Sequence, residues 1–155
     1  MNYSVRHISR YINWGMITVE KTDYGIYLTF VSPINLEETL NFRDEFDSAV
    51  LEIKREFCVF VDMRKLTLLP VDCKPLVEEV QMIARDNGMQ RSVVILSEEL
   101  ATMQLRLIAH KTGIRFWERY IDSSKHDNWE KLGMDWILHA IDPEESIKQA
   151  QTVSD

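Results

Sequence analysis

The sequence predicts an α/β protein with a mixed, mainly parallel β-sheet and helices packed on it. Two short runs, Phe57–Asp62 and Ser92–Leu96, are almost wholly apolar. They lack the alternation of a strand with one wet face and are short for a helix, so both are expected to be strands covered on both faces. Helical patterns follow them, and successive β-to-α units imply parallel pairing through right-handed crossovers.

The first two strands are expected to form a hairpin. Ile17–Lys21 and Tyr24–Val31 are rich in β-branched and aromatic residues, which favour strands. Asp23 or Gly25 can supply the turn between them, so the pair is predicted to be antiparallel.

The first helix follows this hairpin and runs to about Arg55. Asn35, with Glu38 three residues later, resembles a capping box, the pattern in which an N-cap side chain binds the first free backbone N–H groups. Apolar residues then recur at helical spacing. The predicted inner face consists of Phe42, Phe46, Ala49 and Ile53.

The second and third helices follow the two apolar strands. The second begins at Asp72 or Cys73, with Asp72 as its expected N-cap, and stops at Gly88. The third can be capped by Ser97, and Gly113 ends it. Their predicted inner faces are Leu76, Val80, Ile83 and Ala84 for the second helix and Leu100, Met103, Leu107 and Ile108 for the third.

The last strand is predicted over Ile114–Asp122, at an edge of the sheet because edges best tolerate charge. Alternation places Arg115, Trp117 and Arg119 on one face and Phe116, Glu118 and Tyr120 on the other. Asp127 and Glu130 then form a second capping-box pattern, which opens a helix. The apolar face of that helix consists of Trp129, Leu132, Trp136 and Ala140.

The 155 residues suit one domain, because at this length one core buries roughly 70% of the unfolded surface. Residues 1–15 carry aromatic and basic side chains without a clear period, so they are expected to be an arm. Residues 16–142 form the α/β domain, and residues 143–155 an acidic tail with a short helix at most.

Charge and hydropathy exclude several classes of partner. The chain has 18 basic and 25 acidic residues, which gives a net charge of −7 and would repel a nucleic-acid backbone. No apolar run approaches the roughly 18 residues that span a bilayer, and no signal peptide is visible. We therefore expect a cytoplasmic protein that binds neither nucleic acid nor membrane.

The sequence gives no reason to expect a metal or another cofactor. Cys58 and Cys73 fall in a predicted strand and in the first turn of a predicted helix, which matches neither a disulfide framework nor ligand spacing, so both are expected to be reduced. The four histidines lack H-E-x-x-H spacing, and the five glycines form no phosphate-binding loop.

The element order from about Met16 to Ala140, with VDMRKLTLLPVDCKPLVEEV in its middle, resembles the anti-sigma-factor antagonist family and the wider STAS-like domains. In that family an apolar strand ends in Asp, a short loop carries a Thr and an apolar pair, and Asp-Ser-Ser-Gly opens a helix. The corresponding residues here are Val61-Asp62, Thr67-Leu68-Leu69 and Pro70-Val71-Asp72-Cys73.

The resemblance implies a STAS-like fold and a regulatory role through binding a protein partner. The phosphoacceptor serine of such antagonists falls at Asp72. A serine kinase cannot phosphorylate Asp, although its charge mimics part of a phosphate at a helix N-terminus. We therefore expect a non-catalytic interaction module that is not phosphorylated at this position.

Polar side chains that follow the three parallel strands are expected to meet at one edge of the sheet, where open α/β sheets bind ligands. The candidates for binding a partner or ligand are Asp62, Thr67, Asp72, Ser97, Glu98, Lys125 and His126. Asp62 is expected chiefly to bind N–H groups of its own loop. Asp122 should lie at the same edge.

Two catalytic or signalling alternatives use the same residues. Asp62 with Ser97 resembles part of a response-regulator receiver, but receivers place an acidic pair after their first strand, whereas this chain begins with a hairpin. Ser97, His126 and an acid would suit a hydrolase, but there is no G-x-S-x-G elbow. A small-ligand binding protein or an enzyme using a pocket at this edge is the alternative function.

A homodimer is the last expectation. Aromatic residues and arginines are enriched at interface centres, and the predicted arm has this mixture in Tyr3, Arg6, Tyr11 and Trp14. Folding of the arm back onto its own domain would use the same side chains.

Overall fold

The computed structural model describes residues 16–154, so the predicted arm lies outside the described residues. The strands are β1 (Met16–Lys21), β2 (Gly25–Val31), β3 (Phe57–Lys65), β4 (Met89–Leu96) and β5 (Glu118–Asp122). The helices are α2 (Leu36–Glu52), α3 (Lys74–Asp86), α4 (Glu99–Thr112), α5 (Trp129–His139) and α6 (Pro143–Ser154), with single 3₁₀ turns at Val71–Cys73 and Ile114–Phe116.

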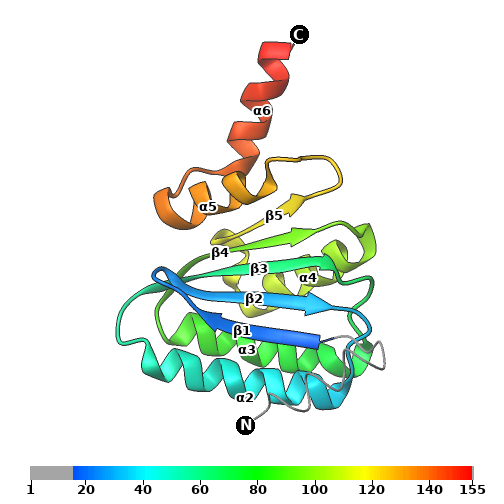
Figure 1. The fold of residues 1–155 in the computed structure, drawn as a ribbon, viewed down its shortest axis with the longest axis vertical. Coiled ribbons are helices and arrows are strands. Elements are labelled where there is room, and N and C mark those ends of the chain that lie inside the picture. The colour runs from blue at the N-terminus through cyan, green and yellow to red at the C-terminus, as the bar shows by residue number, and fades with distance from the viewer. Residues whose placement is uncertain (1–15, 155) are drawn as a thin grey trace.

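The five strands form one mixed sheet in the order β1-β2-β3-β4-β5 (Figure 1). β1 and β2 pair antiparallel as the predicted hairpin, and every later pair is parallel. The Thr22 and Gly25 backbones close the hairpin turn by exchanging hydrogen bonds. The predicted α/β class and the mixed, mainly parallel sheet are thus confirmed.

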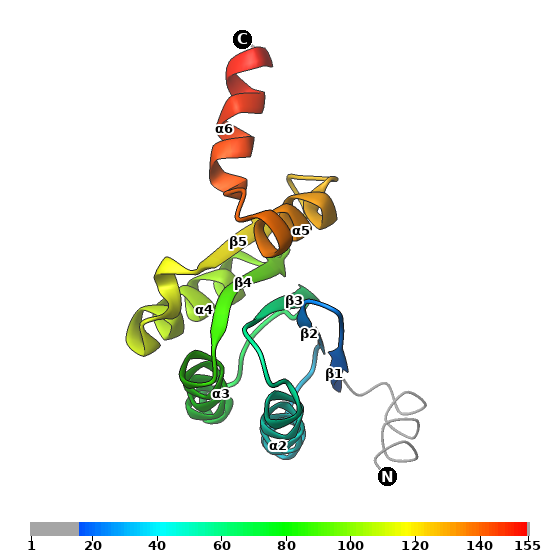
Figure 2. The ribbon, with the colours of Figure 1, turned by 90° about the vertical axis from the view of Figure 1, so that its left-hand side faces the viewer.

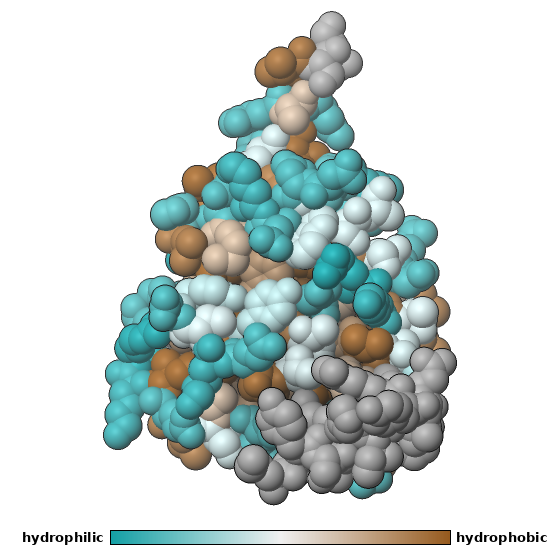
Figure 3. Space-filling view, in the orientation of Figure 1, coloured by the Kyte–Doolittle hydropathy of each residue, from teal (hydrophilic) through white to brown (hydrophobic). Residues whose placement is uncertain are grey.

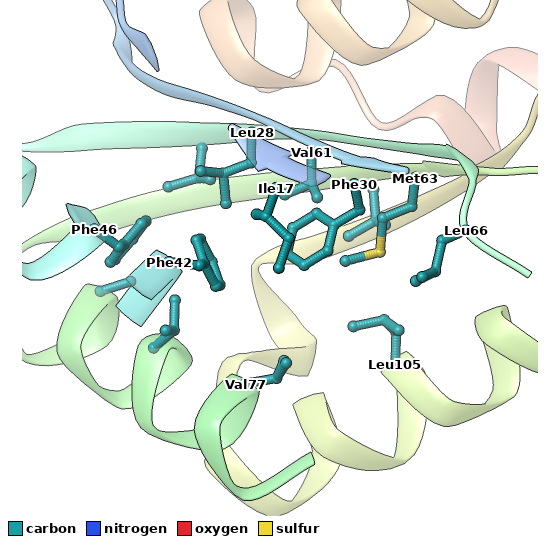
Figure 4. Packing of buried hydrophobic residues seen from close by; sticks show 14 of the residues in the cluster. Ile17, Leu28, Phe30, Phe42, Phe46, Val61, Met63, Leu66, Val77 and Leu105 are labelled. Carbon is teal, nitrogen blue, oxygen red and sulfur yellow. The ribbon is translucent and has the colours of Figure 1, made fainter. Parts of the chain in front are cut away.

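One face of the sheet carries α2, α3 and α4, because each right-handed crossover adds its strand on the same side of the last one. The side chains of Leu28, Val61 and Met63 extend from the strands toward Val77 and Leu105 on the helices (Figure 4). This core is continuous from β2 to α4.

α5 covers the opposite face (Figure 2) and packs on β3, β4 and β5. The residues of β3 alternate between the two cores, with Val59 and Val61 in the first and Cys58 and Phe60 in the second. The prediction that the central strands are covered on both faces is therefore confirmed. Gly133 brings α5 close to the sheet, since a Cβ there would lie 2.6 Å from Cε2 of Phe60.

α6 projects from the body of the protein (Figures 1 and 3). Of its apolar side chains, Ile147 packs partly against the second core, whereas Val153 is 87% exposed. None of the described helices is long and apolar enough to cross a membrane.

The helix signals are accurate at one helix start and at two helix ends, since α3 also stops before Gly88 with Asn87 as its C-cap, and wrong at three helix starts. Asn35 Oδ1 accepts the Glu38 N–H at 2.8 Å, so the first predicted cap is confirmed, and Gly113, at φ +87°, ends α4. Asp72 does not cap α3, because a 3₁₀ turn precedes the helix and places Cys73 at the N-cap. Glu98 and Asn128 replace Ser97 and Asp127 at the other two starts.

Two further predictions near the third crossover are wrong. The last strand begins at Glu118, because the Trp117 N–H bonds to the Ile114 carbonyl and closes a 3₁₀ turn over the predicted strand start. α4 turns a different face inward, since its small alanines pack on the core. Its buried residues are Ala101, Leu105, Ile108, Ala109 and Thr112, whereas the predicted Leu100, Met103 and Leu107 are exposed.

Candidate functional site

The parallel register brings the predicted site to the carboxyl edge of the sheet. Met63 pairs with Leu96, and Leu96 pairs with Asp122. Asp122 ends β5, Ser97 directly follows β4, and Asp62 lies three residues before the end of β3, so the three residues lie toward the same edge on neighbouring strands. The predicted strand end at Asp62 is wrong, because β3 continues to Lys65. Asp72 lies beyond them, in the exposed 3₁₀ turn that leads into α3.

Asp62 is bound by Arg64, two residues further along β3. Its carboxylate accepts two hydrogen bonds of 2.9 Å from the Arg64 guanidinium and one of 3.1 Å from the Arg64 backbone N–H. Burial would raise the pKa of Asp62, but these bonds outweigh it and hold the pKa below its ordinary value. Asp62 was expected to bind N–H groups of a loop, but the N–H that it binds belongs to Arg64 within β3. Asp62 stays ionised and paired.

The Arg64 guanidinium also stacks on an aromatic ring. It lies 4.1 Å from the ring centroid of Trp129, the first residue of α5. A guanidinium over Trp gains cation–π energy while its edge remains free to bind a carboxylate. Asp62, Arg64 and Trp129 thus form a chain of contacts that joins β3 to α5. Arg64 and Trp129 were not predicted as site residues, although a basic residue two positions after a strand-end Asp was visible in the sequence.

The hydroxyl groups at this edge hold loops together. Ser97 Oγ donates to the Arg64 carbonyl at 2.7 Å. Ser32 Oγ accepts the Thr67 backbone N–H at 3.0 Å, and the Ser32 and Thr67 hydroxyls lie 3.3 Å apart. Because the Ser97 hydroxyl hydrogen points to a carbonyl, it is not shared with a base as a hydrolytic nucleophile requires.

The remaining predicted residues are dispersed. Asp72 Oδ1 lies 3.7 Å from the buried Cys73 Sγ. The backbone carbonyl of Glu98 accepts hydrogen bonds from the N–H and the hydroxyl of Thr102. The side chain of Glu98 makes no capping hydrogen bond. Lys125 Nζ is 3.9 Å from Asp122 Oδ2. His126 lines a separate hollow between α5 and α6.

An exposed apolar surface at the same edge escaped prediction. The side chain of Gln104 on α4 bonds both the N–H and the C=O of Leu69, each at 2.9 Å, and so fixes the loop before α3 against α4. Around this contact lie five apolar side chains that are 47–78% exposed, which we call the apolar patch: Leu68, Val71, Leu100, Met103 and Leu107. The i, i+3, i+7 spacing of its α4 members predicts the inner face of the helix, but the structure turns these side chains outward.

A second unpredicted group is Glu118, which is 5% exposed at the start of β5. Burial raises its pKa to about 7, although Ser92 and Tyr120 donate hydrogen bonds to the carboxylate. The available signal was a carboxylate on the predicted strand face that otherwise carries the aromatic residues Phe116 and Tyr120.

The described residues contain no cluster that could hold a metal ion, and two comparisons with known proteins find no match. Within residues 16–154, no three His, Cys, Asp or Glu side chains lie close enough together to hold a metal ion. No model of a known protein family matches the chain, and a search of curated proteins finds no similar sequence.

Proposed function

We propose that this protein is a non-catalytic regulatory module of STAS-like type that acts by binding a protein partner. The element order that carries the resemblance, a hairpin followed by three β-to-α units, is the order of the fold. One feature of the motif region also supports the proposal: Asp72 stands exposed before α3.

The observation that carries the proposal is the apolar patch. Large exposed apolar side chains in neighbouring segments are typical of a site of interaction, and here they flank the loop that holds the STAS-like motif. The Gln104–Leu69 hydrogen bonds fix the two segments of the patch relative to each other, so the surface is formed before a partner arrives. Preorganisation of this kind lowers the entropic cost of binding.

The chemistry of the edge supports binding over catalysis. Asp62 is held in an ion pair and the Ser97 hydroxyl is donated to a carbonyl. Neither group is placed to activate a nucleophile or to transfer a proton, because each already has a strong partner. Asp72 presents a fixed negative charge where such antagonists carry a serine, so binding here would not need phosphorylation.

The test is quantitative affinity capture from the source cell extract with two matched variants. Leu107→Glu places a charge in the apolar patch, and Leu51→Glu places the same charge on α2 at nearly equal exposure, 66% against 67%. We expect a captured protein that is retained by the wild type and by Leu51→Glu but lost with Leu107→Glu, because burying an unpaired charge opposes association.

Two results would contradict the proposal. One is capture of the same proteins at the same level by all three chains. The other is loss with both variants, which would indicate a general effect of added charge. Circular dichroism of each variant establishes that α4 and α2 remain folded.

A further inference from the structure

Glu118 lies between an internal cavity and a hollow in the surface, and its side chain lines both. The cavity, of about 50 Å³, lies in the first core and is lined mainly by apolar side chains. The hollow, of about 430 Å³, lies over the start of β5. A proton from solvent can therefore reach a carboxyl group whose other side faces the core.

Two hydroxyl groups bind the Glu118 carboxylate. Ser92 Oγ on β4 donates to Oε1 at 3.0 Å, and the Tyr120 hydroxyl, two residues along β5, donates to Oε2. Burial raises the pKa of Glu118 to about 7, although these hydrogen bonds oppose the rise. The carboxyl group therefore gains or loses its proton near neutral pH while the side chain is buried.

The Tyr120 hydroxyl has two acceptors but only one proton to donate. Besides Glu118, it lies 3.3 Å from the backbone carbonyl oxygen of Leu105 on α4. Burial and the Glu118 carboxylate raise the pKa of Tyr120, so the phenol keeps its proton. The choice of acceptor depends on Glu118, because an ionised carboxylate accepts a stronger hydrogen bond than a neutral group does.

The Tyr120 ring also joins β5 to α4. The Arg106 guanidinium of α4 stands 4.5 Å from the ring centroid, and the ring packs against the first core. A change in the acceptor of the Tyr120 hydroxyl is therefore a change in how β5 is attached to α4.

We propose that Glu118 and Tyr120 form a proton-operated hydrogen-bond switch between β5 and α4. When Glu118 is ionised, the Tyr120 hydroxyl donates to its carboxylate. When Glu118 takes up a proton, its carboxyl group donates to the Tyr120 oxygen, and the Tyr120 hydroxyl donates to the Leu105 carbonyl. Proton uptake thus extends the chain of hydrogen bonds from β5 into α4.

The other charged and titratable groups around Glu118 were considered from both sides. On the core side, Glu118 is the one titratable residue among the described residues that line the cavity. On the hollow side, the Arg106 charge favours the ionised form of Glu118 and so opposes the effect of burial on its pKa. The remaining charged or titratable residues that line the hollow are Arg106, His110, Arg115, Arg119, Tyr120 and Glu144. Of these residue types, histidine is the one that ordinarily titrates near neutral pH, so His110 needs a control.

The switch acts on the helix that carries most of the apolar patch. Leu105 lies in α4 between Met103 and Leu107, two exposed residues of that patch. An effect of the switch on partner binding would rest on the proposed function. The switch itself goes beyond that function and is tested on the protein alone.

The direct test is a pH titration of the ¹³C-labelled protein, followed by NMR from about pH 5 to about pH 9. We expect the chemical shifts of the Glu118 carboxyl carbon and the Leu105 backbone carbonyl carbon to change with a common midpoint near pH 7. The Leu105 carbonyl carbon should respond because its oxygen gains a hydrogen bond when Glu118 is protonated. A Leu105 shift that does not titrate, or that titrates with a different midpoint, would overturn the proposal.

Two conservative variants remove one part of the switch each. Tyr120→Phe removes the hydroxyl and keeps the ring, so the Leu105 carbonyl should no longer titrate while the Glu118 carboxyl still does. Glu118→Gln removes the titrating group, so the Leu105 carbonyl should again keep one shift across the pH range. Titration of Leu105 that persists in either variant would refute the switch.

Two further variants serve as controls. Tyr27→Phe removes a partly buried phenol that packs against the second core, and His110→Gln removes the histidine of the hollow. Both proteins should show the titrations of Glu118 and Leu105 that the wild type shows. Loss of the Leu105 titration in His110→Gln would assign it to His110, and loss in Tyr27→Phe would show that removal of any buried phenol has this effect; either result would overturn the proposal.

Discussion

Gly133→Ala tests how closely α5 packs on the sheet. The new methyl group would lie 2.6 Å from Cε2 and 3.0 Å from Cζ of Phe60, well inside van der Waals contact. Phe60 is fully buried and its ring stacks on Tyr27 at 5.2 Å, so the ring has little room to move away. Crowding a packed core in this way costs about 1–3 kcal/mol.

Helix propensity acts in the opposite direction. Replacing Gly by Ala within a helix stabilises it by about 1 kcal/mol. The expected net change in the free energy of unfolding is therefore a loss of about 0–2 kcal/mol, which urea unfolding of the two proteins can measure.

A double-mutant cycle separates the two effects. In a Phe60→Leu background the ring edge is absent, so Gly133→Ala should there stabilise the protein by about 1 kcal/mol through helix propensity alone. If Gly133→Ala stabilises the wild type as much as it stabilises the Phe60→Leu protein, α5 does not lie as close to β3 as described.

Three further predictions concern helix capping, pH and association. Asn35→Ala should lower the free energy of unfolding by about 1 kcal/mol, because it removes a helix cap. Asp72→Ala removes no cap and should change the free energy of unfolding by less than about 0.5 kcal/mol. Both values can be measured by urea unfolding, and equal losses for the two variants would contradict this assignment of the caps. Glu118, whose pKa is raised from 4.5 to about 7, retains its proton in the folded state over a pH range in which the unfolded state has lost it. Unfolding at pH 5 and pH 8 should therefore show the wild type losing stability relative to Glu118→Gln as pH rises, by up to about 3 kcal/mol; parallel curves would refute a buried Glu118. If residues 1–15 mediate a homodimer, sedimentation should show a dimer for the full chain and a monomer for a folded chain lacking them, and a monomer in both cases would remove the idea.

The fold could be predicted because its signals are local. The unbroken apolar runs of β3 and β4 indicate strands covered on both faces, and the Asn35 cap and the glycine at 113 mark helix ends that the structure contains. Each of these features depends on a few neighbouring residues, so tertiary contacts did not override them.

The face of α4 could not be predicted because the helix carries two apolar stripes. The alanines of α4 pack closest to the core. Which of the two stripes faces inward depends on the space that neighbouring elements leave for the helix. A long-range contact, the Gln104–Leu69 pair, then leaves the larger apolar residues outside. The same limit applies to Asp62, whose position at the sheet edge follows from topology but whose pairing with Arg64 over Trp129 requires α5 to be in place.

The position of α5 late in the chain, over the second face of the sheet, has a consequence for biosynthesis. The helices of the first core have all been synthesised once α4 is complete. Phe60, Val93 and Ile95, by contrast, are covered by a helix that begins only at Trp129. At about 5–20 residues per second, a ribosome takes roughly 1–5 s to make the intervening chain. During that interval the nascent sheet exposes an apolar surface to chaperones and to other chains. A truncated chain that ends before α5 would keep that apolar surface exposed and would therefore be prone to aggregate.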